Sequence, residues 1–219
     1  MAIKIVALCL GLLQTNCYIV GDTDSREAVV IDPSDEASAI LDVLAQEQWV
    51  AREILATHSH FDHILAAGEV KAATGAPFRL HRSDLQQLRD APQMTMAFIG
   101  KAIPAPPEPD GFVDEGDTIR LGSITLETLF TPGHSSGHVS FVLPSEYVVF
   151  SGDCLFLGSI GRTDLPGGDY TALMRSIAEK LLPLGDDFTV AAGHGQATTI
   201  GRERMSNPFL FDWLNSSHP

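Results

Sequence analysis

The stretch Thr57-His58-Ser59-His60-Phe61-Asp62-His63 indicates both the chemistry and the fold of this 219-residue chain. Three histidines and one aspartate within six residues seldom gather in a loop that binds no metal. Imidazole and carboxylate ligands together suit zinc, iron or manganese, whereas calcium and magnesium prefer oxygen ligands only. The i, i+2 spacing of His58 and His60 favours an extended turn that directs both imidazoles to one side. The stretch therefore predicts a metal site.

Three more candidate ligands stand next to glycines later in the chain. They are His134 in Thr131-Pro132-Gly133-His134, Asp153 in Ser151-Gly152-Asp153 and His194 in Gly193-His194-Gly195. With His58, His60, Asp62 and His63 they exceed the four ligands of a closed structural zinc site, and no cysteine is among them. We therefore predict a catalytic centre with open coordination positions. It holds two divalent metal ions, with zinc as first choice and iron or manganese as alternatives.

Short apolar and β-branched runs bounded by Gly, Asp or Pro predict the strands. These runs are residues 3–10, 17–20, 28–31, 53–56, 78–81, 118–121, 124–130, 139–143, 147–150 and 188–192. Start and stop signals predict helices at 37–48, 62–74, 84–89, 169–182 and 199–213, the last interrupted at Asn207-Pro208. Strands in two groups with helices between or after them favour an α/β (α+β) fold, an αββα four-layer sandwich. No Pro/Gly/Ser-rich linker divides the chain, so residues 1–219 are predicted to form a single domain.

Each group of candidate ligands follows a predicted strand. Catalytic and binding residues are commonly carried on the loops of a rigid scaffold. We therefore expect the histidine-rich stretch, His134, Asp153 and His194 to meet at one rim of a sheet.

The charge of the chain excludes several classes of partner. The formal net charge is -14, from 14 Lys and Arg against 28 Asp and Glu. A nucleic-acid backbone or an anionic membrane surface would need a basic protein surface. A small anionic substrate remains compatible, because two divalent ions make their site locally positive. The predicted partner is therefore a small-molecule substrate, with no nucleic acid and no membrane.

The cysteines and the N-terminus indicate a cytoplasmic protein. Cys9, Cys17 and Cys154 are odd in number and form no Cys-x-x-Cys motif, so we expect small buried residues rather than disulfides. The apolar run 3–13 contains Lys4 and lacks a cleavage site, so it is not read as a signal peptide. It is also shorter than the ~20 residues that span a bilayer. Monomer and homodimer both stay open.

The order of these motifs resembles that of the metallo-β-lactamase superfamily. Further stretches resemble its short bacterial glyoxalase II branch, the hydroxyacylglutathione hydrolases: Asn16-Cys17-Tyr18-Ile19-Val20, Ser151-Gly152-Asp153-Cys154-Leu155-Phe156, Gly161-Arg162-Thr163-Asp164, Glu203-Arg204 and Asn207-Pro208-Phe209-Leu210. The resemblance implies an αββα sandwich and zinc, often mixed with iron or manganese. It also implies a first metal site of His58, His60 and His134, a second of Asp62, His63 and His194, and Asp153 as the bridging carboxylate.

The chain departs from the longer glyoxalase II enzymes at the substrate side. It ends soon after the last motif, where those enzymes continue into a helical domain that grips glutathione. Gly161-Arg162-Thr163-Asp164 also stands where they carry a Lys and a Tyr. Arg162 is therefore a candidate substrate-binding residue, since its guanidinium suits a carboxylate in a bidentate contact. A salt bridge from Arg162 to Asp164 is the alternative.

The predicted function is hydrolysis of a thioester, with S-2-hydroxyacylglutathione as substrate and glutathione and a 2-hydroxy acid as products. A metal-bound hydroxide attacks the carbonyl carbon. Thiols have a pKa near ~8.5, so the thiolate leaves without a dedicated general acid. Asp62 and Asp153 are the predicted catalytic carboxylates, with Asp62 orienting the nucleophile and Asp153 bridging the ions.

Three other functions are compatible with parts of the same pattern. An iron-dependent persulfide dioxygenase would use His58, His134 and Asp153 as a two-histidine, one-carboxylate triad. Phe61 favours hydrolysis, because the persulfide dioxygenase branch usually carries a smaller residue at this position. A lactonase or esterase would use the same hydroxide, and a non-enzymatic metal-binding protein is the least favoured reading.

Some residues outside the ligand set allow two interpretations. His138 either supports His134 from behind or merely begins a strand. The proline-rich segment 102–111 either borders the pocket or only covers the surface. The tail aromatics Phe209, Phe211 and Trp213 could pack on the core or on a second subunit, and the core is favoured. His81 and His218 are interpreted as surface residues.

Overall fold

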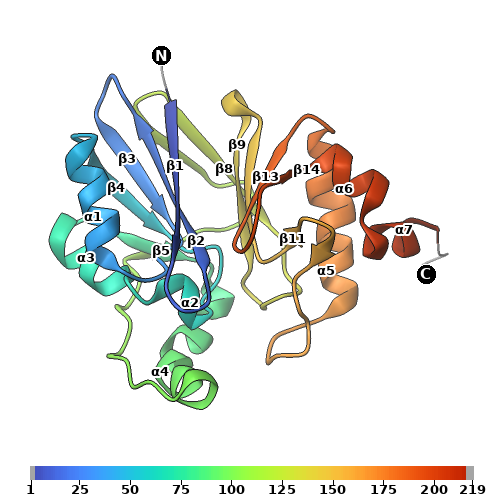
Figure 1. The fold of residues 1–219 in the computed structure, drawn as a ribbon, viewed down its shortest axis with the longest axis horizontal. Coiled ribbons are helices and arrows are strands. Elements are labelled where there is room, and N and C mark those ends of the chain that lie inside the picture. The colour runs from blue at the N-terminus through green and yellow to red at the C-terminus, as the bar shows by residue number, and fades with distance from the viewer. Residues whose placement is uncertain (1–2, 216–219) are drawn as a thin grey trace.

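A computed structural model describes residues 3–215 of the chain (Figure 1). Two six-stranded sheets pack face to face, and helices cover the outer face of each. Helices α1 (Ala37–Gln46) and α3 (Ala67–Thr74) lie on the first sheet, while α5 (Tyr170–Ser176) and α6 (Ile200–Ser206) lie on the second. The predicted αββα sandwich is confirmed. That the whole chain forms one domain stays a prediction.

The first sheet has the strand order β1-β2-β3-β4-β5-β6. Its strands are β1 (Ile3–Leu10), β2 (Thr15–Asp22), β3 (Glu27–Ile31), β4 (Val50–Leu55), β5 (Phe78–Leu80) and β6 (Gly111–Phe112). The first three strands are antiparallel, and the pairs from β3 to β6 are parallel. In β3, Ala28 and Val30 pack on the helix side, whereas Val29 and Ile31 pack toward the other sheet. Burial on both faces explains why this strand is apolar throughout.

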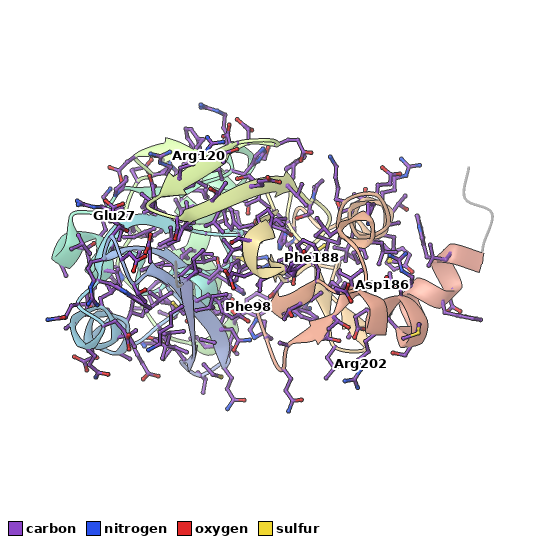
Figure 2. All side chains as sticks on the ribbon, turned by 90° about the horizontal axis from the view of Figure 1, so that it is seen from above. Glu27, Phe98, Arg120, Asp186, Phe188 and Arg202 are labelled. Carbon is purple, nitrogen blue, oxygen red and sulfur yellow. The ribbon has the colours of Figure 1, made fainter. Side chains whose placement is uncertain are left out.

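The second sheet has the order β14-β13-β10-β9-β8-β7. Its strands are β7 (Thr118–Leu121), β8 (Ile124–Phe130), β9 (Val139–Leu143), β10 (Val148–Gly152), β13 (Thr189–Ala192) and β14 (Thr198–Thr199), while β11 (Leu155–Phe156) and β12 (Ser159–Ile160) form a separate pair. The predicted hairpin turning at Gly122-Ser123 is present. Side chains fill the space between the two large sheets (Figure 2). There, the rings of Tyr18 and Phe150 lie 5.1 Å apart.

The predicted helix 62–74 is wrong in one respect, because it is two helices. The short α2 (Phe61–Ile64) ends before α3 begins at Ala67. The backbone N–H of Ala66 donates to the carbonyl of Pro33 at 3.0 Å instead of continuing the helical ladder. This tertiary bond breaks the helix and leaves Asp62 and His63 on one isolated turn.

The predicted helix 84–89 is too short. A 3-10 turn, η1 (Arg82–Asp84), leads into α4 (Leu85–Ile99), which passes through Pro92 and ends at Gly100 with φ 66°. Proline removes a backbone donor and normally interrupts a helix. Here the buried residues Leu88, Ala91 and Thr95 continue the helical spacing across it. Packing of that face therefore outweighs the local cost of the proline.

In the C-terminal part, the helix interruption at Asn207-Pro208 agrees with the prediction, but the predicted packing of the aromatic side chains agrees only in part. Helix α5 continues through the π turn η3 (Ile177–Leu181) and the 3-10 turn η4 (Leu182–Leu184), and a further 3-10 turn is η2 (Pro144–Glu146). Helix α6 ends at Asn207, and α7 (Pro208–Asn215) follows. The expected packing of Phe209 and Phe211 is wrong, since they are 40% and 64% exposed. Leu210 is buried instead, and Trp213 packs against the same core.

Two further expectations are corrected. Cys9 is exposed, although Cys17 and Cys154 are buried as predicted. His81 is buried, with its Nε2 3.0 Å from a carboxylate oxygen of Asp114. His218 lies outside the described residues. Among residues 3–215, none of the helices has the length and apolar character of a membrane-spanning segment.

Candidate metal centre

Four loops bring the seven candidate ligands to one rim of the sandwich. The histidine-rich stretch follows β4, and His134 follows β8. Asp153 follows β10 directly, and His194 follows β13. Because β10 and β13 are parallel neighbours, their ends lie at the same edge. The ligands converge as expected, but at a rim to which both sheets contribute and not at the rim of a single sheet.

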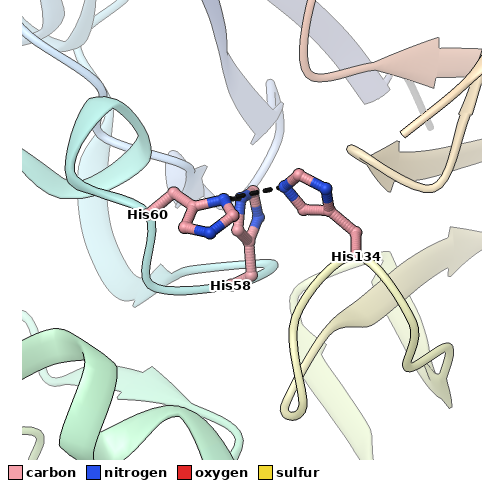
Figure 3. A group of neighbouring side chains, drawn as sticks. All are labelled: His58, His60 and His134. Carbon is pink, nitrogen blue, oxygen red and sulfur yellow. Dashed lines mark hydrogen bonds between the residues drawn. The ribbon is translucent and has the colours of Figure 1, made fainter. Parts of the chain in front are cut away.

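His58, His60 and His134 form a compact group of ring nitrogens (Figure 3). The Nδ1 atom of His60 lies 3.0 Å from Nε2 of His58 and 2.7 Å from Nε2 of His134. The three rings come from two loops that are far apart in sequence and point toward one another. Three convergent imidazole nitrogens are a suitable donor set for zinc, iron or manganese.

Asp62, His63 and His194 form a second group beside the first. The Oδ2 atom of Asp62 lies 3.2 Å from Nε2 of His194 and 3.6 Å from Nε2 of His63. Thr15 fixes this carboxylate by donating its hydroxyl hydrogen to Oδ2 at 2.9 Å. The group thus offers two imidazoles and one oriented carboxylate.

The carboxylate of Asp153 lies between the two groups. Its Oδ1 is 3.4 Å from Nε2 of His63, and its Oδ2 is 3.5 Å from Nε2 of both His134 and His194. His58, His63 and Asp153 also offer ligand atoms that lie within 4.8 Å of one another. One carboxylate therefore faces ligands of both groups, as a bridging ligand would.

Buried hydrogen-bond acceptors hold the Nδ1 atoms of three histidines and so leave their Nε2 atoms available as metal ligands. The hydroxyl of Thr57 donates to Asp32 at 2.8 Å, so it accepts from Nδ1 of His58 at 3.0 Å. Nδ1 of His63 donates to Asp32 at 3.0 Å, and Nδ1 of His134 donates to the Arg162 carbonyl at 2.8 Å. In each of these rings Nε2 then keeps its lone pair toward the cluster. Such fixed tautomers are typical of histidine ligands.

Unpaired buried atoms show that the residues present fit a metal. Among the described side chains, Nε2 of His63 and Oδ1 of Asp153 are buried without a hydrogen-bond partner. Leaving such groups unpaired away from water is costly. A cation between them would satisfy both, and the mixed imidazole and carboxylate set suits a divalent transition metal.

The electrostatics of the two groups differ. Burial, followed by the charges of neighbouring imidazoles, lowers the pKa of His58 well below its usual value. Burial and His134 lower the pKa of His60 to about 3. Burial would lower the pKa of His194 too, but the carboxylates of Asp153 and Asp62 raise it to about 10. His58 and His60 are thus held as neutral imidazoles, the form that binds metals.

Residues 10–194 match the metallo-β-lactamase superfamily. The chain belongs to this superfamily. Its members bind divalent metals, in agreement with the clustered histidines and aspartates.

Individual members resemble the chain over most of its length. It is 39% identical to the hydroxyacylglutathione hydrolase GloC of Haemophilus influenzae over 198 residues, covering 90% of this chain and 93% of GloC. The crystal structure of BLEG-1 B3 metallo-β-lactamase aligns with a TM-score of 0.89 at 42% identity, covering 94% of this chain and 99% of that one. The structure of TTHA1623 in a di-iron-bound form aligns with a TM-score of 0.85 at 42% identity, covering 94% and 100%.

Behind the ligands of this superfamily member lies a buried carboxylate that sequence reasoning missed. Asp84 accepts from the backbone N–H of Ser59 at 3.0 Å, from the hydroxyl of Ser135 at 2.8 Å and from the N–H of Gly137. It thereby ties the loop of His58 and His60 to the loop of His134. Asp84 lies outside every ligand motif, so its role depends on contacts that are distant in sequence.

His138 is neither a free ligand nor a mere strand start. Its Nε2 accepts from the backbone N–H of Asp153 at 3.1 Å, and its Nδ1 donates to the hydroxyl of Thr131 at 2.9 Å. Both ring nitrogens are thus occupied. His138 supports Asp153 directly, whereas the sequence suggested support of His134.

A cavity of about 240 Å³ is lined by five of the seven candidate ligands, His60, Asp62, His134, Asp153 and His194, while His58 and His63 are buried behind them. In the described part of the chain, α4 contributes to its outer wall and segment 102–111 does not line it, so of the two interpretations of this segment the one in which it borders the pocket is wrong. Arg162 lines the cavity, and its guanidinium contacts both carboxylate oxygens of Asp164 at 2.7 Å. The sequence left substrate contact and salt bridge open, and the salt bridge is formed.

Proposed function

We propose that this metallo-hydrolase cleaves a thioester, and that S-2-hydroxyacylglutathione is its substrate. The observation that carries the proposal is the convergence of the seven predicted ligands in one cluster, five of which line one cavity. The 39% identity to a protein named hydroxyacylglutathione hydrolase supports the choice of thioester. A cytoplasmic location and a monomeric or dimeric state stay predictions.

The ligand assignment is part of the proposal. His58, His60 and His134 would hold one divalent ion, Asp62, His63 and His194 the other, and Asp153 both. Zinc is our first choice, with iron or manganese as alternatives. Such ions supply an acidified water as nucleophile and polarise the substrate carbonyl. The chain holds its imidazoles through Asp32, Thr57 and the Arg162 carbonyl, and Asp62 through Thr15.

Two side chains at the cavity are assigned further roles. Asp62 is fixed by Thr15 and faces the cavity, so it is suited to orient the nucleophile. Arg162 would exchange Asp164 for a carboxylate of glutathione. Both partners of that salt bridge are more than half exposed, and such pairs are weak, so the exchange is inexpensive.

The test is release of free thiol from S-lactoylglutathione by the zinc-loaded protein. Asp153→Ala should abolish the release, because it removes the carboxylate that faces both groups. Asp42→Ala, an exposed carboxylate on α1, is the matched control and should keep full activity. Full activity of Asp153→Ala would contradict the bridging role.

A second candidate function is hydrolysis of a β-lactam amide. It is favoured by the 42% identity to the protein named BLEG-1 B3 metallo-β-lactamase. A chromogenic cephalosporin assayed beside the thioester measures this directly. Oxygen uptake with glutathione persulfide covers the dioxygenase alternative, and uptake without thioester cleavage would replace the proposed function.

A further inference from the structure

An apolar wall lines the cavity beside the candidate metal ligands. It is formed by Leu13 from the β1–β2 connection, Phe61 from α2, and Met94 and Phe98 from α4. The rings of Phe61 and Phe98 lie 6.3 Å apart in a tilted arrangement. Three separate elements therefore contribute apolar side chains to one surface.

Part of this wall is exposed although it is strongly apolar. Leu13 is 44% exposed and Phe98 is 49% exposed. Exposed apolar side chains that gather on one concave surface commonly mark a binding groove. Here they adjoin His60, Asp62, His134, Asp153 and His194, which line the same cavity. The group that covers the wall would therefore lie next to the reacting carbonyl.

The size and charge of the cavity restrict what enters it. Cavities that enclose drug-sized ligands have roughly 300–1,000 Å³. At about 240 Å³ this cavity is too small to enclose a tripeptide thiol. Among the described lining residues Arg162 alone is a Lys or Arg, and it is paired with Asp164. The enclosed group is thus small, and the larger part of glutathione would remain outside.

We propose that this wall binds the side chain of the acyl group and that the enzyme prefers 2-hydroxyacyl groups with apolar side chains larger than the methyl of lactate. The inference rests on the proposed thioester hydrolysis and names its substrate class. A second cavity of about 120 Å³ shares Leu13, Phe61 and Asp62 with the first. Its further lining includes the apolar residues Leu10, Leu65 and Ile99 together with the charged residues Asp35 and Lys101, so longer acyl chains find additional apolar contacts there.

The first experiment varies the acyl group while glutathione stays constant. Glutathione thioesters of lactate, 2-hydroxybutanoate and 2-hydroxyhexanoate are compared by kcat/KM. Full burial of one methylene is worth about a fourfold gain. We expect kcat/KM to rise with chain length, by roughly tenfold or more from lactoyl to 2-hydroxyhexanoyl.

Substitutions in α4 test whether its apolar side chains cause the preference for longer acyl groups. Met94→Ala and Phe98→Ala should reduce the ratio of 2-hydroxyhexanoyl to lactoyl hydrolysis to about threefold or less, because each removes apolar contact area. Met96→Ala is the matched control. Met96 lies on the same helix and is 49% exposed, but it is not among the described lining residues of the cavity, so its ratio should equal that of the parent.

Binding of thioethers separates this inference from the proposed function. S-methyl-, S-propyl- and S-hexylglutathione are not hydrolysed, and calorimetry should show tighter binding as the alkyl chain grows. Chain-length-dependent binding without cleavage of any thioester would support the apolar site and contradict the hydrolase. If thioester cleavage and thioether binding are both independent of chain length, the proposed apolar site is wrong, whereas the proposed hydrolysis is still supported. Equal ratios for Met94→Ala, Phe98→Ala and the parent would also overturn it.

Discussion

The carboxylate of Asp32 accepts a hydrogen bond from Nδ1 of His63 at 3.0 Å, and both side chains are buried. The same carboxylate accepts from the backbone N–H of Thr57 at 2.6 Å and from its hydroxyl at 2.8 Å. Thr57 in turn contacts Nδ1 of His58. One aspartate therefore sets the orientation of an imidazole in each of the two groups.

Asp32→Asn should weaken metal binding while preserving the shape of the site. The new amide places a donor where Asp32 has an acceptor, so Nδ1 of His63 must accept and the proton moves to Nε2. A protonated Nε2 is no ligand. Loss of such an outer partner typically costs about 10–100-fold in metal affinity. Chelator competition with metal analysis measures this, and two ions held at parent affinity would contradict the role of Asp32.

The ligand set could be predicted because it depends on local motifs. Each group of ligands follows a strand end, of β4 in the first sheet or of β8, β10 and β13 in the second, and these strand ends meet at one rim of the sandwich. The sandwich was predictable for a similar reason, since runs such as 28–31 are apolar on both faces. In both cases the pattern that carries the structure is contained within a few neighbouring residues.

The features that sequence reasoning missed depend on contacts between distant residues. The N–H of Ala66 breaks a helix because it meets Pro33, and Asp84 matters because Ser59, Ser135 and Gly137 surround it. Asp32 follows β3 at the same rim as the ligands, which was the one available signal for its role. Helix α4 extends past the predicted end at residue 89, because its buried face of Leu88, Ala91 and Thr95 packs against the rest of the fold.

Asp84→Ala should destabilise the fold and loosen both metal-binding loops. The change leaves the N–H groups of Ser59 and Gly137 and the hydroxyl of Ser135 without their buried acceptor. Unsatisfied buried donors cost about 1–3 kcal/mol each when water does not replace the partner, so we expect a loss of about 2–4 kcal/mol in the free energy of unfolding. Urea unfolding of the metal-free protein measures it. Asp84→Asn keeps one acceptor and should lose less; an equal loss for both would argue against the hydrogen bonds as the cause.

Gly193→Ala should disrupt the centre by sterics alone. A Cβ at this position would lie 2.2 Å from Oδ1 of Asp153 and 2.7 Å from Cε1 of His63. Both side chains would have to move, so we expect loss of bound metal and of hydrolysis. Gly68→Ala is the control, because its Cβ would meet only Pro107 at 3.6 Å and it lies within α3. That variant should be stabilised by about 0.5–1 kcal/mol, and retention of metal by Gly193→Ala would show that the packing there is looser than described.

Removal of metal should lower the thermal stability of the protein. A ligand that binds only the folded state at a free concentration of 100 times its Kd stabilises by about 2.7 kcal/mol. For domains of this size each kcal/mol corresponds to roughly 2–4 °C in Tm, so one occupied site should raise Tm by about 5–11 °C.

The expected order of Tm is chelator-treated protein lowest and zinc-loaded protein highest. Magnesium should cause little shift, because it prefers oxygen ligands over imidazole. Asp153→Ala should lose most of the zinc-dependent increase, since its carboxylate faces both groups of ligands. A Tm that is the same with chelator and with zinc would mean that these seven side chains gather without binding a metal.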